Sequence, residues 1–123
     1  MRRIIYNKHG APTLYITGAG VVYGLENQVR GFVHNEQLAD ERGAPRGWFD
    51  GSFLWNMEGY LVGFVKGAKP PYTLTLPKTQ PLSVKPQPTP ALLTPFLQMR
   101  PKPELHFEWS ERTIEETFTN LIT

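Results

Sequence analysis

Three histidines and a few acidic residues are the side chains of this chain that could do acid–base or metal chemistry. His9 lies in "NKHG" and His34 in "HNEQ", both with the composition of turns, whereas His106 precedes Glu108 by two residues in "ELHFEWS". Residues two apart on an extended segment share a face, so His106 and Glu108 could bind one metal ion together. A structural zinc site needs four ligands, and the chain has no cysteine to add to these two. We therefore expect no metal and no cofactor, and we interpret His9 and His34 as solvated turn residues.

The candidate catalytic groups are equally isolated. Ser52 follows Gly51, but it lacks the Gly-x-Ser-x-Gly pattern and the helix that form a nucleophile elbow. Asp40, Glu41 and Asp50 lie in turn-like stretches, where a carboxylate has a structural use. The glycines of "GAGVVYG" are not followed by a helix that would cradle a phosphate. The sequence thus predicts a protein that is not an enzyme.

A fourfold internal repeat is the pattern that must position any functional side chain. The segments "IIYNKHGAPTLYITGAG", "VVYGLENQVRGFVHNEQ", "LADERGAPRGWFDGS" and "LWNMEGYLVGFVKGA" align along most of their length. Their central aromatic residues recur at spacings of 17, 16 and 16, and each is preceded by Gly or Asn five positions earlier. The central aromatics are Tyr15, Phe32, Trp48 and Phe64, and the preceding residues are Gly10, Asn27, Gly43 and Gly59.

Each repeat has the composition of a β-hairpin. "NKHG", "DERG" and "NMEG" place Asn or Asp at the first position of a turn and Gly three residues later, where a positive φ is needed. A second turn follows each central aromatic, and Asp50-Gly51 suits a two-residue type I′ turn. We therefore predict an all-β fold in which four hairpins surround a pseudo-four-fold axis.

Alternation along a strand puts the two apolar columns of the repeat on opposite faces. We expect the four central aromatics near the axis and Ile16, Val33, Phe49 and Val65 in an outer row that needs a cover. Gly31, Gly47 and Gly63 precede three of the aromatics and indicate strands that bend or approach another backbone closely. The aromatics are either a filled core or the lining of an axial pocket for an apolar molecule or a membrane lipid. The residues of that alternative pocket are Tyr15, Phe32, Trp48 and Phe64.

The composition changes after the repeats, which predicts three segments: residues 1–69, 70–103 and 104–123. Ten of the twelve prolines lie between residues 70 and 103, so this segment is interpreted as an extended strap, with residues 72–76 as a possible extra edge strand. In residues 104–123, Ser110 is the expected N-cap of an amphipathic helix. This helix is expected to dock on its own domain or on a neighbour. The residues predicted to bind a partner are Trp109, Ile114, Phe118 and Leu121.

Charge is distributed as unevenly as proline. Residues 1–65 are neutral, residues 66–103 carry six basic and no acidic side chains, and residues 104–123 carry five Glu and one Arg. Six cations over 38 residues with few aromatics among them argue against nucleic-acid binding. No apolar stretch has the length of a transmembrane segment, and no cysteine is present, so a cytoplasmic location is expected.

Taken together, "GAPRGWF", "GYLVGFV", the proline-rich basic segment and the closing "WS" to Phe118 resemble the four-fold β-flower family of small bacterial proteins. Leu14 and Asn27 stand where the other repeats have Gly. The resemblance covers nearly the whole chain and implies a flower-like β fold, and no catalytic residues come with it. We expect a non-enzymatic module that binds another protein or a second copy of itself through the strap and the terminal helix. The alternative is a binder of an apolar ligand.

Overall fold

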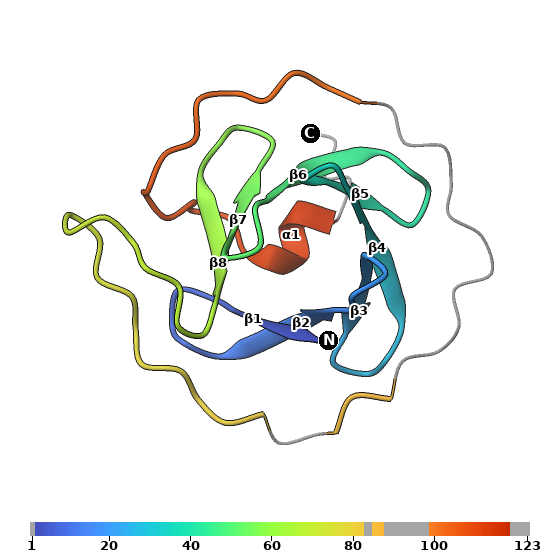
Figure 1. The fold of residues 1–123 in the computed structure, drawn as a ribbon, viewed down its shortest axis with the longest axis horizontal. Helices are drawn as coiled ribbons and strands as arrows, with labels where there is room; N and C mark the ends of the chain where they lie inside the picture. Colours follow the sequence, from blue (N-terminus) through green and yellow to red (C-terminus); the bar gives the residue numbers. More distant parts are fainter. Residues whose placement is uncertain (1, 83–84, 88–98, 119–123) are drawn as a thin grey trace.

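The chain folds into a closed antiparallel β-barrel of eight strands, followed by an extended segment and a short helix (Figure 1). The computed structural model describes residues 2–82, 85–87 and 99–118. The strands are β1 (Arg3–Tyr6), β2 (Pro12–Ile16), β3 (Val21–Gly24), β4 (Val29–His34), β5 (Gln37–Asp40), β6 (Pro45–Phe49), β7 (Phe53–Asn56) and β8 (Leu61–Val65), and the helix is α1 (Ile114–Phe118). The predicted all-β class is confirmed.

Four hairpins build the barrel, and each repeat of the sequence corresponds to one of them. Every strand pairs with its sequence neighbours, and β1 pairs with β8 to close the sheet. The joints between hairpins also repeat: the N–H groups of Val33, Phe49 and Val65 donate to carbonyls in the preceding turns at 2.7, 2.7 and 2.8 Å. The predicted pseudo-four-fold arrangement is therefore confirmed.

The first turn of each hairpin uses the chemistry that the sequence predicts. The side-chain oxygens of Asn7, Asp40 and Asn56 each accept bonds from the N–H groups two and four residues later, at 2.9–3.0 Å. The bulge positions have positive φ, as expected for Gly and Asn there. These four residues, Gly10, Asn27, Gly43 and Gly59, have φ of 78°, 67°, 90° and 89°.

The second hairpin departs from this pattern. It has Gly24 where the other hairpins have Asn or Asp, and the residue paired with Gly24 is a large one, Leu14, where the other joints have Gly. Across two joints of the barrel a glycine faces an Asn or Asp: Gly31 pairs with Asp40, and Gly47 pairs with Asn56. Across β2 and β3 the order is reversed, because Leu14 pairs with Gly24. A Cβ on Gly24 would lie 2.6 Å from Oε1 of Gln28, so that side chain already occupies the space beside it.

The turns at the other end of the hairpins differ in one respect from the prediction. A type I′ turn requires positive φ at both central residues, and at Asp50-Gly51 only Gly51 has it, at 101°. Asp50 instead accepts bonds from the N–H groups of Ser52 and Phe53, both at 2.8 Å. The expected type I′ turn is therefore wrong at this position. Two consecutive positive φ values occur at Asn35 and Glu36, between β4 and β5.

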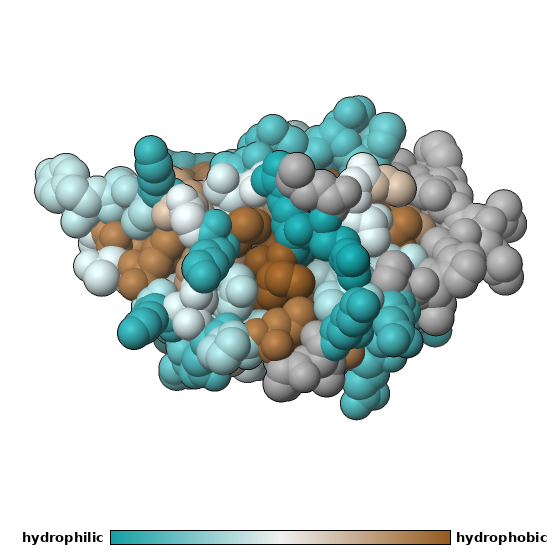
Figure 2. Space-filling model, turned by 60° about the horizontal axis from the view of Figure 1, so that its bottom comes forward, coloured by the Kyte–Doolittle hydropathy of each residue, from teal (hydrophilic) through white to brown (hydrophobic). Residues whose placement is uncertain are grey.

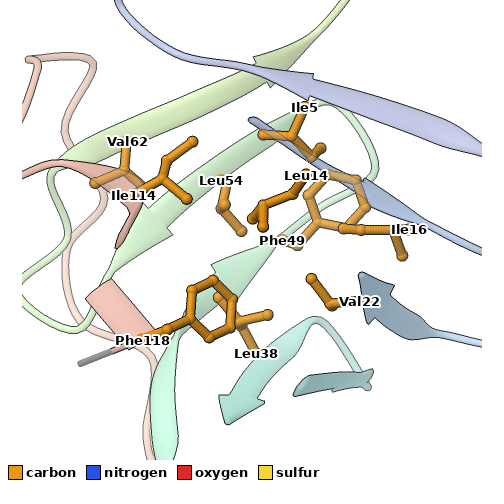
Figure 3. Packing of buried hydrophobic residues seen from close by; sticks show 10 residues of the cluster. All are labelled: Ile5, Leu14, Ile16, Val22, Leu38, Phe49, Leu54, Val62, Ile114 and Phe118. Atoms are coloured by element: carbon orange, nitrogen blue, oxygen red, sulfur yellow. The ribbon is translucent and has the colours of Figure 1, made fainter. Parts of the chain in front are cut away.

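The faces of the strands are opposite to those expected from the aromatic column. Figure 3 shows aliphatic side chains converging inside the barrel with two phenylalanines, Phe49 from β6 and Phe118 from α1. This inner cluster contains residues of the row expected outside, and the central aromatics lie on the outer face. Both columns are apolar, so hydropathy alone did not identify the inner one. The inner cluster consists of Ile5, Leu14, Ile16, Val22, Leu38, Phe49, Leu54, Val62, Ile114 and Phe118, with Val33 and Val65 packed against it.

Helix α1 lies at the centre of the ring of strands in Figure 1 and completes the inner cluster. Its Ile114 and Phe118 are 2% and 9% exposed. A Cβ on Gly63 would lie 3.1 Å from Cδ1 of Ile114, so the small residue in β8 leaves room for the helix. We call α1 the plug.

The start of the plug corrects one prediction. Thr113 Oγ1 accepts from the N–H of Glu116 at 3.2 Å, and Glu116 Oε1 accepts from the N–H of Thr113 at 3.0 Å, which is a capping box. Ser110, the expected N-cap, is instead buried, with its Oγ accepting from Asn56 Nδ2 at 3.1 Å. The helix therefore begins later than the sequence indicated.

The described parts of the strap run along the outside of the barrel (Figure 1). At the first hairpin the N–H of Gln80 donates to Gly10 O at 2.8 Å, and at the fourth the N–H of His106 donates to Gly59 O at 2.8 Å. Near its end the chain adds a parallel bridge between Trp109 and Leu61. The possible edge strand at residues 72–76 does not form, because that stretch begins with a turn. The segment boundaries at residues 69 and 103 stay predictions.

Candidate functional site

Two residues of the predicted aromatic ring, Trp48 and Phe64, belong to an outer belt that the chain's own later segments cover. Trp48 and Phe64 are 3% and 2% exposed and pack in one cluster with residues of the strap and the terminal segment. Phe32 is also buried, at 5% exposure. We call this cluster the aromatic belt: Tyr6, Trp48, Phe53, Trp55, Leu61 and Phe64, with Ile4, Ala68, Leu74, Leu76, Leu105, Phe107 and Trp109 packed against it.

Tyr15, the first residue of the predicted ring, is linked to the strap through the side chain of Asn27. Its ring stacks on Tyr23 with centroids 5.1 Å apart, and its hydroxyl donates to Asn27 Oδ1 at 2.5 Å. The same Asn27 oxygen accepts from the N–H of Gln87 in the strap at 2.8 Å. Burial, together with the nearby Tyr23, raises the pKa of the Tyr15 hydroxyl. Tyr15 is therefore a structural link between barrel and strap.

The terminal segment fills the belt with directional contacts. Phe107 meets Phe53 and Trp55 edge-on at centroid distances of 5.0 and 5.7 Å. Trp55 Nε1 donates to the carbonyl of His106 at 3.0 Å. Lys102 lies 6.0 Å from the ring of Trp48. These contacts occupy the outer aromatic face from within the same chain.

The four predicted partner-binding residues do not form one exposed surface. Trp109 packs against the belt, with its ring 6.2 Å from that of Phe64, while Ile114 and Phe118 lie inside the barrel. Leu121 lies outside the described residues. The three described residues are therefore divided between two clusters of their own chain.

Charged residues surround the plug at the end of the barrel formed by the first turns. Arg30 contacts Glu115 at 2.9 Å and lies over the ring of Phe118 at 5.6 Å. Arg46 contacts Asp40 at 2.9 Å, and both side chains are largely buried. Burial opposes ionisation of Asp40, but N–H bonds from Ala44 and Arg42 and the Arg46 guanidinium outweigh it and lower the pKa of its carboxyl.

A pocket of about 590 Å³ opens among these charged groups. Arg30, Arg42 and Arg46 line it together with Asp40 and Glu41. Two of its arginines contact carboxylates at 2.9 Å, so these charges already stabilise the fold. Sequence reasoning missed the arrangement because its members come from two hairpins and the plug, and the pairing of β4 with β5 and the position of Phe118 bring them together.

The histidine chemistry considered from the sequence has no metal-like geometry in the described part of the chain. His106 stacks on Tyr60 with centroids 5.0 Å apart, and its Nε2 lies 4.0 Å from Glu104, not from Glu108. No group of three His, Cys, Asp or Glu side chains that could hold a metal occurs among the described residues. The ring of His106 thus serves to pack the terminal segment against the fourth hairpin.

The outer surface carries side chains without a use in the fold. Figure 2 shows hydrophilic side chains flanking an apolar area on the side that lies at the bottom of Figure 1. Lys66, Lys69, Lys78 and Lys85 are exposed, and within the described residues they form no salt bridge. Tyr72 is 98% exposed. Throughout the described ranges, no helix has the length and apolar character needed to cross a membrane.

Comparison with known proteins identifies a family whose model matches this chain. A family model described as 4-fold beta flower protein matches residues 3–118, which include all eight strands, the described strap and the plug. No curated protein and no solved structure matches the chain.

Proposed function

Since the chain belongs to the family of 4-fold beta flower proteins, we propose that it is a non-enzymatic module that binds an acidic surface of a protein partner. The binding surface in this proposal is the outward face of the strap together with Lys66 and Lys69, which directly precede it. The absence of cysteine suits a reducing compartment, and we place the protein in the cytoplasm on that ground.

The observation that carries the proposal is the difference between the two sides of the strap. Leu74 and Leu76 point toward the aromatic belt and pack there. Lys78 and Lys85 are exposed, and in the part of the chain that the structure describes they have no acidic neighbour at salt-bridge distance. Residues 66–103 contain no Asp or Glu at all. The inner side of the strap holds the fold together, and the outer side is left with uncompensated positive charge.

A protein partner suits this surface better than a nucleic acid does. Single strands are bound by a basic groove together with aromatic side chains on which bases stack. The aromatic residues beside the strap are turned toward the barrel and are covered, as Trp48 and Phe53 show at 3% and 4% exposure. Spaced lysines with one exposed ring among them, that of Tyr72, lack the run of stacking rings that a single strand needs, and they favour carboxylates on a partner, with attraction that salt screens.

The sequence predicted that the plug binds a partner, and the proposal does not give it that role. Ile114 and Phe118 complete the inner cluster, so a partner that took them would empty the barrel. We therefore assign binding to the strap surface and not to the helix. No observation favours the alternative, an apolar ligand on the axis, because aliphatic side chains occupy that position.

Site-specific photo-crosslinking in cells tests the proposal. A photoreactive phenylalanine replaces Thr75, which is exposed on the strap, and a control replaces Ala19, which is exposed in a turn at the other end of the hairpins. We expect a protein adduct at position 75 that is absent at position 19. The captured protein, once purified, should bind the full chain more weakly in high salt and at least tenfold more weakly when Lys66, Lys69, Lys78 and Lys85 are all changed to Gln. Adducts that do not depend on these lysines, or equal adducts at both positions, would refute the proposal.

A further inference from the structure

The loop between β8 and the strap projects from the barrel and carries an exposed tyrosine at its tip. It extends beyond the outline of the molecule at the left of Figure 1. The N–H of Leu74 donates to Pro71 O at 2.9 Å and closes a turn around Tyr72. Ala68 on one side and Leu74 on the other pack against the aromatic belt, so both ends of the loop are held. We call residues 69–73 the tip.

Tyr72 contributes almost nothing to its own fold, since it is 98% exposed. Single exposed apolar residues are common and need no explanation in themselves. This one, however, follows Pro70 and Pro71, which limit the conformations of the free loop and so reduce the entropy lost when it is bound. Tyrosine is also among the residues that contribute most to binding at protein interfaces.

A second feature of the surface is complementary to this tip. A pocket of about 520 Å³ lies between the turn of the fourth hairpin and the terminal segment. Tyr60 and Trp109 give it aromatic walls, and Glu58, Glu108 and Glu111 give it three carboxylates. The arginine in its lining, Arg112, lies 3.6 Å from Glu116, which reduces its effect on this charge.

We infer that Tyr72 inserts into this pocket on a second copy of the chain, an inference that rests on the proposed function and names the partner. Lys69 of the tip and Lys66 just before it would then face the three glutamates of the pocket, two positive charges against three negative ones. Tyr72 does not occupy the pocket of its own chain, because its side chain is exposed.

The small area that one tip can bury determines how many contacts the assembly needs. One buried tyrosine removes about 150–250 Å² from water, which is far below the area of a stable interface. Two such contacts form together if each copy inserts its tip into the pocket of the other, which gives a two-fold symmetric dimer. The chain is therefore assigned to a weak reciprocal dimer that forms at micromolar or higher concentration.

Sedimentation velocity of the full chain over a concentration series tests this dimer. Tyr72→Ala is expected to weaken dimerisation at least tenfold, and Thr73→Ala, an exposed residue of the same turn, is the matched control that leaves it unchanged. Both variants should unfold at the temperature of the unmodified chain, because neither side chain packs in the barrel. A chain that stays monomeric at all concentrations, or a dimer that Tyr72→Ala does not weaken, would overturn the inference.

A charge exchange separates this contact from other modes of association. Lys69→Glu and Glu111→Lys should each weaken the dimer, since each places like charges at both contacts of the homodimer. An equimolar mixture of the two variants should dimerise again, because both contacts of the mixed pair then bring opposite charges together. A mixture that remains as weak as its components would refute the pairing of tip and pocket. If the strap crosslinks to a different acidic protein while the chain is monomeric, the dimer is refuted and the proposed function stands.

Discussion

Replacement of Asp40 by Asn separates two interactions that one side chain makes. Oδ1 of Asp40 accepts hydrogen bonds from the N–H groups of Arg42 and Ala44 in the first turn of the third hairpin. Its Oδ2 accepts a hydrogen bond from Nε of Arg46 and lies 2.9 Å from Nη2 of the same guanidinium. Asn7 makes the same turn bonds in the first hairpin, so Asn at position 40 preserves the turn. Asp40→Asn therefore removes the ion pair alone, whereas Asp40→Ala removes both interactions.

The magnitude follows from the burial of the pair. The side chains of Asp40 and Arg46 are 10% and 18% exposed, which places them between a surface pair and a fully buried one. Surface pairs contribute about 0–1 kcal/mol, and loss of one partner of a buried pair costs about 3–5 kcal/mol. We expect Asp40→Asn to lower the free energy of unfolding by about 2 kcal/mol at pH 7. Asp40→Ala should cost a further ~1–2 kcal/mol for the two lost N–H bonds.

Urea denaturation as a function of pH is the assay. The pKa of Asp40 in the folded protein lies below its ordinary value of 3.8, so its stabilising contribution is complete above that value and is lost as the pH falls through the lowered folded pKa. Protonated Asp40 carries no charge, like Asn. The difference in stability between the unmodified chain and Asp40→Asn should therefore be constant near neutral pH and should shrink below about pH 4.

A double-mutant cycle with Arg46→Gln can refute this reasoning. If Asp40 and Arg46 stabilise the protein through each other, the two substitutions together should cost less than the sum of the single ones by about 1–2 kcal/mol. A coupling free energy below ~0.5 kcal/mol would show that the contact contributes no more than an exposed pair does. A stability difference that does not change with pH would contradict the assignment of the charge.

Three further substitutions test the plug, the terminal segment and the link between barrel and strap. Ile114→Ala should lower the free energy of unfolding by about 2–4 kcal/mol in urea denaturation, because it empties part of the inner cluster; a loss below ~1 kcal/mol would contradict the packing of the plug. Gly59→Ala places a Cβ 2.2 Å from the carbonyl oxygen of Glu104, whereas Gly67→Ala has a similar φ and nothing within 4 Å; both carry backbone strain of about 1–2 kcal/mol. Only Gly59→Ala should also expose the terminal segment around Glu104 to limited proteolysis, and equal cleavage in the two variants would argue against close packing of that segment on the fourth hairpin. Tyr15→Phe should remove a tyrosine that ionises above the ordinary pH range of the phenol in an ultraviolet titration, since burial raises the pKa of its hydroxyl; an unchanged titration would contradict that assignment.

The local structure of the hairpins follows from the sequence because each turn carries its own chemistry. Asn7, Asp40 and Asn56 satisfy N–H groups within four residues of themselves, so no distant contact is needed to predict them. The repeated spacing then indicates that the hairpins are equivalent, which leads to a ring. The type I′ turn was placed wrongly because Asp50 bonds to the N–H groups after it and thereby favours a longer loop.

The orientation of the strands and the use of the terminal helix depended on interactions that no local pattern contains. Trp48 and Phe49 are adjacent in the sequence and both apolar. Which of them faces the inside of the barrel depends on the helix that fills the barrel and the strap that covers its outside. The pocket between the fourth hairpin and the terminal segment joins Tyr60 to Trp109, residues far apart in the chain. Tyr72 and the lysines could be seen in the sequence, but their exposure could not.

The position of the plug in the chain has a consequence for synthesis. The barrel is complete in sequence at Val65, but the helix that fills it begins at Ile114, 49 residues later. At the usual rate of about 5–20 residues per second, a ribosome needs roughly 2–10 s to add this stretch. During that interval the nascent hairpins expose their inner aliphatic residues without the segment that covers them. A newly made chain is thus most prone to association with chaperones or other chains before α1 has been translated.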